Sequence, residues 1–182
     1  MKRQAGLTSG GVGIVLVLGF MVPLGLAADH PYEAAVRFVL ETARAFRTVY
    51  SKTIVEQANK VGVKPTEKWA TEPHGIMLPA QFLKAAGAEI KEFDLGLIGL
   101  TPIYRSNLPK TEAETQALKK MTANPDLKLL TFPDGKQYKG LAADYAIVQA
   151  CADCHNQHPQ SPRKDFKQGD LMGAIVVRLD VK

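Results

Sequence analysis

The longest amphipathic pattern in the chain runs from Pro31 to Lys60, without a glycine or a second proline. Apolar residues recur there at helical spacing, which predicts one long helix with a single side facing a core. Pro31 suits the first turn of such a helix, and Gly62 follows just beyond its end. The residues of the predicted apolar side are Val36, Val39, Leu40, Ala43, Phe46, Tyr50 and Ile54.

Two shorter helices are predicted further along, after a loop that spans Pro65 to Met77. Pro79 can begin the first of them, since proline is favoured in an opening helical turn. Thr111 begins the second, because Thr111 and Glu114 have the spacing of a capping box. Asn124-Pro125 ends it. One side of the first of these helices carries Phe82, Ala86, Ile90 and Phe93.

Extended segments dominate the second half of the chain. Leu95 to Tyr104 is predicted to be a strand broken by Pro102. The segments 127–132 and 136–141 flank the turn sequence Pro133-Asp134-Gly135, and Gly173 to Val181 alternates apolar and polar residues as a half-buried strand does. Helices first and strands later, joined by short connections, predict an α+β fold with a mostly antiparallel sheet.

The first 27 residues have a different pattern from the rest. Lys2 and Arg3 precede an uncharged apolar run from Gly11 to Leu26, and small residues close it at Ala27. This is the pattern of a secretory signal peptide cleaved after Ala27, so we expect a periplasmic protein with one domain over residues 28–182. An uncleaved membrane anchor is the alternative, but the run is shorter than the roughly 20 residues that span a bilayer.

The charge of the chain points away from nucleic acid as a partner. The formal net charge is +5, and Lys2 and Arg3 of the predicted signal peptide contribute to it. The remaining basic residues are spread along the chain, with Lys119-Lys120 and Arg163-Lys164 as the densest pairs. A nucleic-acid interface requires a concentrated basic face, which this distribution does not predict.

The two cysteines of the chain lie three positions apart, and His155 follows the second. Cys151-Ala152-Asp153-Cys154-His155 is the attachment signature of a c-type haem. Two thiols three residues apart on a helical turn project to the same side, where each can add to one haem vinyl group. His155 then gives the iron its proximal nitrogen. The sequence therefore predicts one covalently attached haem c, with Cys151 and Cys154 as thioether ligands.

Two other interpretations of this segment remain open at this point. A thioredoxin-like redox pair shares the Cys-x-x-Cys spacing, but such a pair belongs at the start of a helix in a βαβ unit. A zinc site built from Cys151, Cys154, His155 and His158 has suitable ligand types. Structural zinc sites, however, usually take their ligands from two separated halves.

The sixth ligand of the haem iron is a separate question. Histidine, methionine, cysteine and tyrosine all serve in this role, and neither cysteine is free to do so. We favour His74 as the distal ligand, because Pro73 and Gly75 can hold a loop against the haem. A vacant apolar pocket is an equal alternative. The other candidates are Met77, Met121, Met172 and His158.

Three further motifs are the segments 77–82 and 102–107, and Cys151 to His155 followed by Gly169 and 172–174. Together they resemble the DUF3365 or Tll0287-like haem-binding domain family. The resemblance covers the chain from about Val36 to Val181. It implies a PAS-like fold, with N-terminal helices packed on an antiparallel sheet. It also implies that Cys151 and Cys154 attach the haem and that His155 is the proximal ligand.

Members of this family occur as small exported cytochromes and as sensory domains of membrane kinases. Some are thought to supply a distal cysteine from the first long helix, but this chain has none between Arg47 and Ser51. We therefore expect Tyr50 to line the distal side instead. Arg105 is a further candidate for the haem pocket, where a peroxidase or nitrogen-oxide enzyme would need a polar group for proton transfer.

The function expected from these features is that of an exported monohaem c-type cytochrome. It would pass single electrons between periplasmic redox partner proteins, with the haem supplying the redox chemistry. The alternative is a haem-based redox or diatomic-gas (NO, CO or O₂) sensor or binding protein with an open or displaceable sixth site. Catalysis ranks below both, because nothing in the spacing of Arg105 and His74 requires it.

Overall fold

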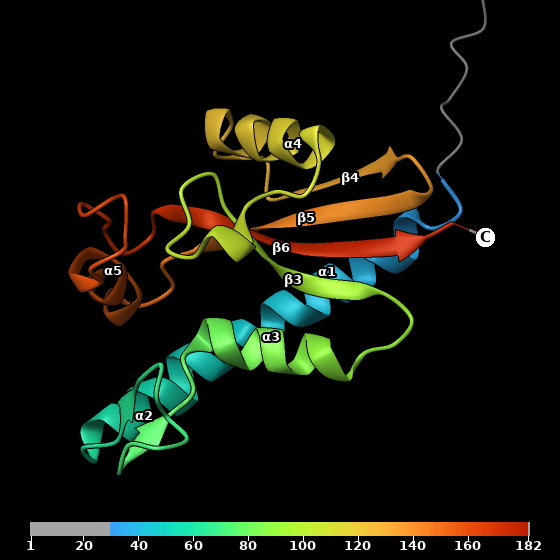
Figure 1. The fold of residues 1–182 in the computed structure, drawn as a ribbon. Helices are drawn as coiled ribbons and strands as arrows, with labels where there is room; N and C mark the ends of the chain where they lie inside the picture. Colours follow the sequence, from blue (N-terminus) through green and yellow to red (C-terminus); the bar gives the residue numbers. More distant parts are fainter. Residues whose placement is uncertain (1–29, 182) are drawn as a thin grey trace, which may run out of the picture.

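A four-stranded antiparallel sheet forms the centre of the computed structural model, which describes residues 30–181 (Figure 1). The strand order is β3-β6-β5-β4. The strands are β3 (Asp94–Ile98), β4 (Leu129–Asp134), β5 (Gln137–Tyr145) and β6 (Leu171–Asp180). The predicted signal peptide, residues 1–27, lies outside the described residues.

One long helical segment covers the first face of the sheet. It consists of α1 (Glu33–Val49), a π-helical stretch (Tyr50–Val55) and α2 (Glu56–Lys60). Gly62 follows with a φ of 82°, as expected of a glycine that ends a helix. α3 (Pro79–Glu89) lies beside α1 on the same face. The core between helices and sheet contains Val36, Leu40, Ala43, Leu83, Leu95, Tyr138, Ala142, Ile175 and Val177.

The predicted apolar side of the long helix is correct in its first half and wrong in its second. Phe46 and Ile54, expected in the core, are 64% and 50% exposed. Arg47, Ser51 and Val55 are buried in their place. The buried side of the helix therefore includes polar residues, because each has a partner inside the fold: Arg47 pairs with Asp144, and the Ser51 hydroxyl donates to the carbonyl of Arg47.

The first turn of α3 and the connection before it follow the sequence prediction closely. Pro79 opens α3, and the side chain of Gln81 accepts a hydrogen bond of 3.1 Å from the amide of Leu78, the N-cap residue. A short parallel pair of strands, β1 (Lys64–Pro65) and β2 (Gly75–Ile76), lies between α2 and α3. The rest of this connection is formed by turns, as expected of the predicted loop.

The opposite face of the sheet is covered by α4 (Glu112–Ala123). Thr111 is its N-cap, with the hydroxyl oxygen 3.3 Å from the amide nitrogen of Glu114, so the predicted capping residue is confirmed. A second core lies under this helix and contains Ala117, Leu118, Met121, Leu141, Ala143, Ala174 and Val176, together with Ile98 at the end of β3. The predicted α+β class is therefore confirmed.

All four strands differ from their predicted bounds, since β5 continues to Tyr145 and β6 begins at Leu171. β3 ends at Ile98, and the chain then leaves the sheet through a loop and the 3₁₀ turn η2 (Arg105–Asn107). β4 continues through Pro133 to Asp134, and Gly135 with a φ of 62° begins the turn to β5. Within residues 30–181, no helix is long and apolar enough to cross a membrane.

Candidate functional site

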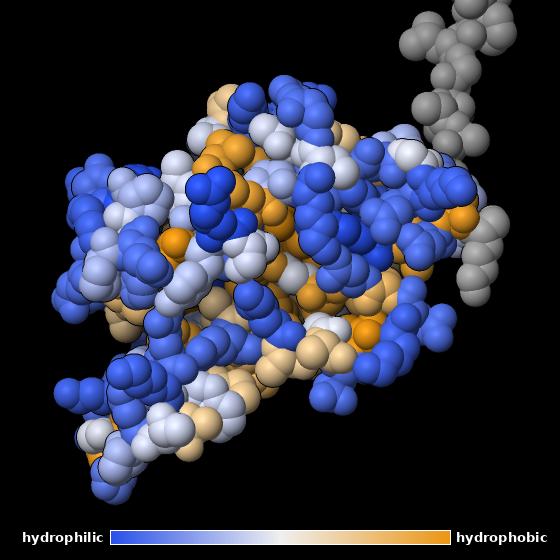
Figure 2. Space-filling view, in the orientation of Figure 1, coloured by the Kyte–Doolittle hydropathy of each residue, from blue (hydrophilic) through white to orange (hydrophobic). Residues whose placement is uncertain are grey.

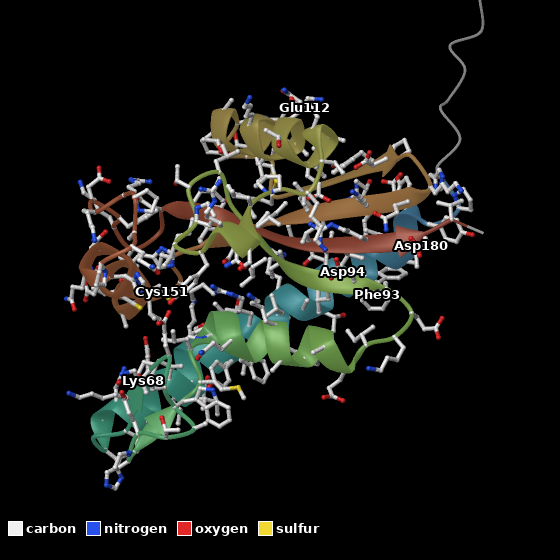
Figure 3. All side chains as sticks on the ribbon, in the orientation of Figure 1. Lys68, Phe93, Asp94, Glu112, Cys151 and Asp180 are labelled. Carbon is white, nitrogen blue, oxygen red and sulfur yellow. The ribbon has the colours of Figure 1, made fainter. Side chains whose placement is uncertain are left out.

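The connection between β5 and β6 carries α5 (Gln149–Gln157), which lies beyond one end of the sheet (Figure 1). Cys151, Cys154 and His155 all belong to this helix, and side chains three and four residues apart on a helix share a face. Both cysteines are free thiols and half-buried. Figure 3 shows Cys151 on α5, at the end of the molecule farthest from Asp180. The segment is anchored to the sheet by a small cluster of buried residues: Ala146, Ala152 and Phe166.

A cavity of about 330 Å³ lies against Cys154 and His155. It is lined by residues from distant parts of the chain, including the first turns of α3, the loop after β3 and the start of β6. Most of its exposed lining is apolar, and Figure 2 shows apolar side chains in the middle of this face with hydrophilic ones around them. The apolar residues are Leu78, Ala80, Leu97, Ile98, Pro102, Ile103 and Met172.

The imidazole of His155 is held in place by the loop that follows α5. The ring of Phe166 meets it edge-on, with 5.5 Å between ring centroids. The side chain of Asn156 fixes this loop: its amide donates to the carbonyl of Phe166 at 2.8 Å and its oxygen accepts from the amide of Phe166 at 2.9 Å. Burial lowers the pKa of His155, and the positive charge of Arg47 lowers it further. Both effects favour the neutral imidazole, which is the form that binds a metal ion.

The thiol of Cys154 does not have the properties of a redox-active cysteine. Burial raises its pKa, and the carboxylate of Glu67 adds to the effect. Reactive cysteines of thioredoxin-like pairs have lowered pKa values and lie in βαβ units. Here α5 connects β5 and β6, which are antiparallel neighbours. Within residues 30–181, no three His, Cys, Asp or Glu side chains are grouped to hold a metal ion, so the site does not have the form of a zinc site.

Arg47 is a buried cavity residue that sequence reasoning missed. It reaches the cavity from α1, and its Nη2 lies 2.9 Å from Oδ2 of Asp144 at the end of β5. Both residues are buried, and Nε and Nη1 of Arg47 have no hydrogen-bond partner. A signal for it exists in the sequence, since Arg47 follows Val36, Leu40 and Ala43 at helical spacing and so belongs to their face.

A polar cluster borders the cavity at the C-terminal end of α5. The hydroxyl of Tyr104 donates to the carboxylate of Glu67, with oxygen–oxygen distances of 2.7 and 2.8 Å, and lies 3.3 Å from Nε2 of His158. The hydrogen bond to Glu67 raises the pKa of Tyr104 to about 12. His158 is therefore engaged with this cluster, which joins α5 to the loops around it.

The structure does not bring Tyr50, Arg105 or His74 to the cavity. Tyr50 stacks on Phe82, with ring centroids 4.4 Å apart, and its hydroxyl donates to the carbonyl of Met77 at 2.8 Å. Arg105 is exposed on η2. His74 is exposed in the turn before β2, with a φ of 59°.

Of the predicted methionine candidates, Met172 lines the cavity, whereas Met121 is 1% exposed in the core under α4. The structure thus unites the Cys-x-x-Cys-His segment and Met172, but none of the loop residues proposed for the distal side.

Comparison with known families agrees with this arrangement. The profile of the Tll0287-like family matches residues 26–179. This chain belongs to the Tll0287-like family. A search of curated proteins finds no significant match.

One solved structure, that of the cyanobacterial heme-protein Tll0287, is similar to this Tll0287-like chain with a TM-score of 0.53 and 18% sequence identity. The similarity covers 83% of this chain and 96% of the cyanobacterial protein. At this identity the likeness is one of fold, and the chemistry of the site rests on the residues of this chain.

Proposed function

We propose that this chain binds one haem covalently through Cys151 and Cys154, with His155 as a ligand of the iron. The observation that carries the proposal is that a single helix, α5, holds both thiols and a neutral imidazole on one face beside a largely apolar cavity. The Cys-x-x-Cys-His spacing is the attachment signature of haem c. The similar cyanobacterial structure is itself described as a heme-protein.

The other residues of the site are suited to holding such a group. Phe166 fixes the orientation of the His155 ring, and the mostly apolar lining would lower the polarity around a haem. Lys84 lies at the exposed side of the lining, with Nζ 3.2 Å from Oδ1 of Asn107, and offers a positive charge to a haem carboxylate. When bound, the haem supplies one-electron redox chemistry. The protein supplies ligation, orientation and a low-polarity environment.

The role we propose is single-electron transfer outside the cytoplasm, with periplasmic redox proteins as partners. The signal-peptide pattern of residues 1–27 supports export of the chain. Met172 is the one soft donor besides His155 and Cys154 on the cavity lining described by the structure, and methionine with histidine is a ligand pair of electron-carrying cytochromes.

Binding of a small ligand, such as NO, CO or O₂, is the second candidate function. Arg47 favours it, because this buried residue lines the same cavity and two of its guanidinium nitrogens have no hydrogen-bond partner. Hydrogen-bond donors near a haem iron help to decide whether a small ligand is bound. This function requires an open or displaceable sixth position.

Covalent attachment is tested by producing the chain with its signal peptide in a bacterium that matures c-type cytochromes. The denatured protein should retain one haem, and the absorption of its pyridine complex should be that of haem c. The double variant Cys151→Ala with Cys154→Ala should release its haem on denaturation. Met121→Leu, at a residue that does not line the cavity, serves as the control. A wild-type protein without covalent haem would reject the proposal.

Spectra of the oxidised and reduced protein then separate the two roles. A reduced haem that is low-spin and indifferent to CO and NO supports electron transfer, and Met172→Ala should then make it high-spin. A reduced wild-type haem that is high-spin and binds either gas supports the second function. His74→Ala is expected to leave both spectra unchanged, because His74 is exposed and outside the cavity.

A further inference from the structure

Two cationic side chains line the cavity, and they differ in their surroundings. Lys84 is exposed and hydrogen-bonded to Asn107. Arg47 is 6% exposed and is held by a single ion pair with the buried Asp144. A charge in a buried position is normally paired and fully hydrogen-bonded, since water cannot solvate it there. Arg47 is paired, but it is not fully hydrogen-bonded.

The unused donors of Arg47 are part of a rigid arrangement. Asp144 is the next-to-last residue of β5 and pairs with Gly173 of β6 beside a register shift. Its carboxylate holds Nη2 of Arg47 at 2.9 Å. Nε and Nη1 remain buried without a partner. Guanidinium donors lie in a fixed plane, so a guanidinium held at one nitrogen presents the others in a defined direction. Because Arg47 lines the cavity, a ligand bound there is the available acceptor for these donors.

The two cavity residues that matter for ligand binding, His155 and Arg47, come from different elements. His155 is supplied by α5 and Arg47 by α1, and both line the same space. Among the residues that line this space, Arg47 is the buried cation.

We infer that the Arg47–Asp144 pair is the binding group for a small anionic or strongly polar ligand on the haem iron, with Arg47 donating hydrogen bonds to it. This inference rests on the proposed haem site. Asp144 already balances the charge of Arg47, and a ferric haem core carries one positive charge. An anion such as azide, cyanide or nitrite therefore brings the net charge of the buried site to zero. Carbon monoxide is a poor hydrogen-bond acceptor and gains little from Arg47.

A haem carboxylate is the competing acceptor for Arg47. Its charge is best placed where water can reach it, because burial of an additional carboxylate is costly. Lys84 offers a cation at the exposed part of the lining, whereas Arg47 is buried next to a carboxylate that already pairs with it. The structure therefore favours the ligand on the iron.

The test compares the holoprotein with three variants. Arg47→Met combined with Asp144→Asn removes both members of the pair and so leaves no buried charge alone. Arg47→Lys keeps the pair but lacks the planar group of donors, and it carries the test if the double variant does not fold. Arg44→Gln is the matched control, because Arg44 lies one turn earlier on α1 and pairs only with the exposed Glu41.

Azide and cyanide are titrated into the ferric protein, and the stretching frequency of CO is measured on the ferrous complex. Loss of charged hydrogen bonds should raise the Kd of each anion by about tenfold to hundredfold in the double variant. The anion Kd values of Arg47→Lys should lie between those of the double variant and those of the wild type. The CO stretch should move to higher frequency, since a positive group near the bound ligand lowers it. Arg44→Gln should match the wild type.

Several results would overturn the inference while leaving the haem site intact. A wild-type ferric protein that binds neither anion has no ligand site for Arg47 to serve. Unchanged anion Kd values and an unchanged CO stretch in the variants assign Arg47 a structural role. If the anion Kd values and the CO stretch are unchanged but the spectrum of the ligand-free protein is altered, Arg47 is assigned to a haem carboxylate. Absence of covalent haem in the wild type would instead reject the proposed function itself.

Discussion

Arg178 and Glu114 form a two-point ion pair in the interior, between β6 and α4. Nε of Arg178 lies 2.6 Å from Oε1 of Glu114, and Nη2 lies 2.8 Å from Oε2. Lys139 of β5 adds a contact of 2.8 Å to Oε1 and one of 2.7 Å to Asp134 of β4. Arg178 also reaches Asp94 of β3 at 2.7 Å. This network connects α4 to all four strands.

Removal of Glu114 should destabilise the protein strongly. Glu114→Ala leaves Arg178 and Lys139 buried without their shared carboxylate, and breaking a buried pair from one side costs about 3–5 kcal/mol. Urea denaturation followed by circular dichroism measures the loss. Glu112→Gln, on the exposed side of the same helix, should change the free energy of unfolding by less than about 0.5 kcal/mol. Equal stability of the two variants would show that the network contributes little.

The same carboxylate should make stability depend on acid. Hydrogen bonds from Arg178 and Lys139 outweigh burial and lower the pKa of Glu114 from 4.5 to about 2. The unfolded chain therefore binds this proton at a higher pH than the folded one does. The contribution, about 3 kcal/mol, is complete above pH 4.5 and declines as the pH falls from there to about 2. Denaturation curves at pH 6, 4 and 3 measure it, and Glu114→Gln should flatten the dependence.

Gly173 should not tolerate a side chain. A Cβ there would lie 2.3 Å from the carbonyl oxygen of Ile98, so Gly173→Ala has to displace the end of β3. The expected cost is about 1–3 kcal/mol, and the haem absorption should shift because Gly173 and Ile98 both line the cavity. Gly96→Ala is the control, since its nearest atom would lie at an ordinary 3.8 Å. A Gly173→Ala protein with wild-type stability and spectrum would contradict this account.

Tyr50 should prove to be a structural residue. Tyr50→Phe keeps the stack on Phe82 and loses one hydrogen bond to Met77, which costs about 1 kcal/mol of stability. Tyr50→Ala loses the stack as well and should be less stable still. Thermal unfolding gives the order of the three proteins. The haem spectrum of Tyr50→Phe should equal that of wild type, and a changed spectrum would place Tyr50 beside the haem after all.

Local sequence signals predicted the helices well but assigned the buried side of the first one only in part. Thr111 and Pro79 act within one helical turn, so their effects can be read from neighbouring residues. The burial of Arg47 depends on Asp144, nearly a hundred positions later, and no local pattern contains that pairing. Hydrophobicity alone therefore placed Phe46 in the core and overlooked the arginine beside it.

The site shows the same difference between features set by local spacing and features set by contacts between distant residues. The common face of Cys151, Cys154 and His155 follows from helical spacing alone. The walls of the cavity come from α1, α3, the loop after β3 and the start of β6, which only the tertiary fold brings together. His74 was proposed from its flanking proline and glycine. These residues do form a turn, but the turn lies outside the cavity.

The small buried cluster under α5 has a consequence for how maturation of the protein can be followed. Ala146, Ala152 and Phe166 form this cluster in the segment 146–170, and Lys164 and Lys167 in the same segment are exposed. Two thioether bonds and an iron–imidazole bond would add strong attachments at the centre of the segment. Trypsin should therefore cleave the haem-free chain near Lys164 first and the loaded chain much later, so the rate of proteolysis reports cofactor insertion.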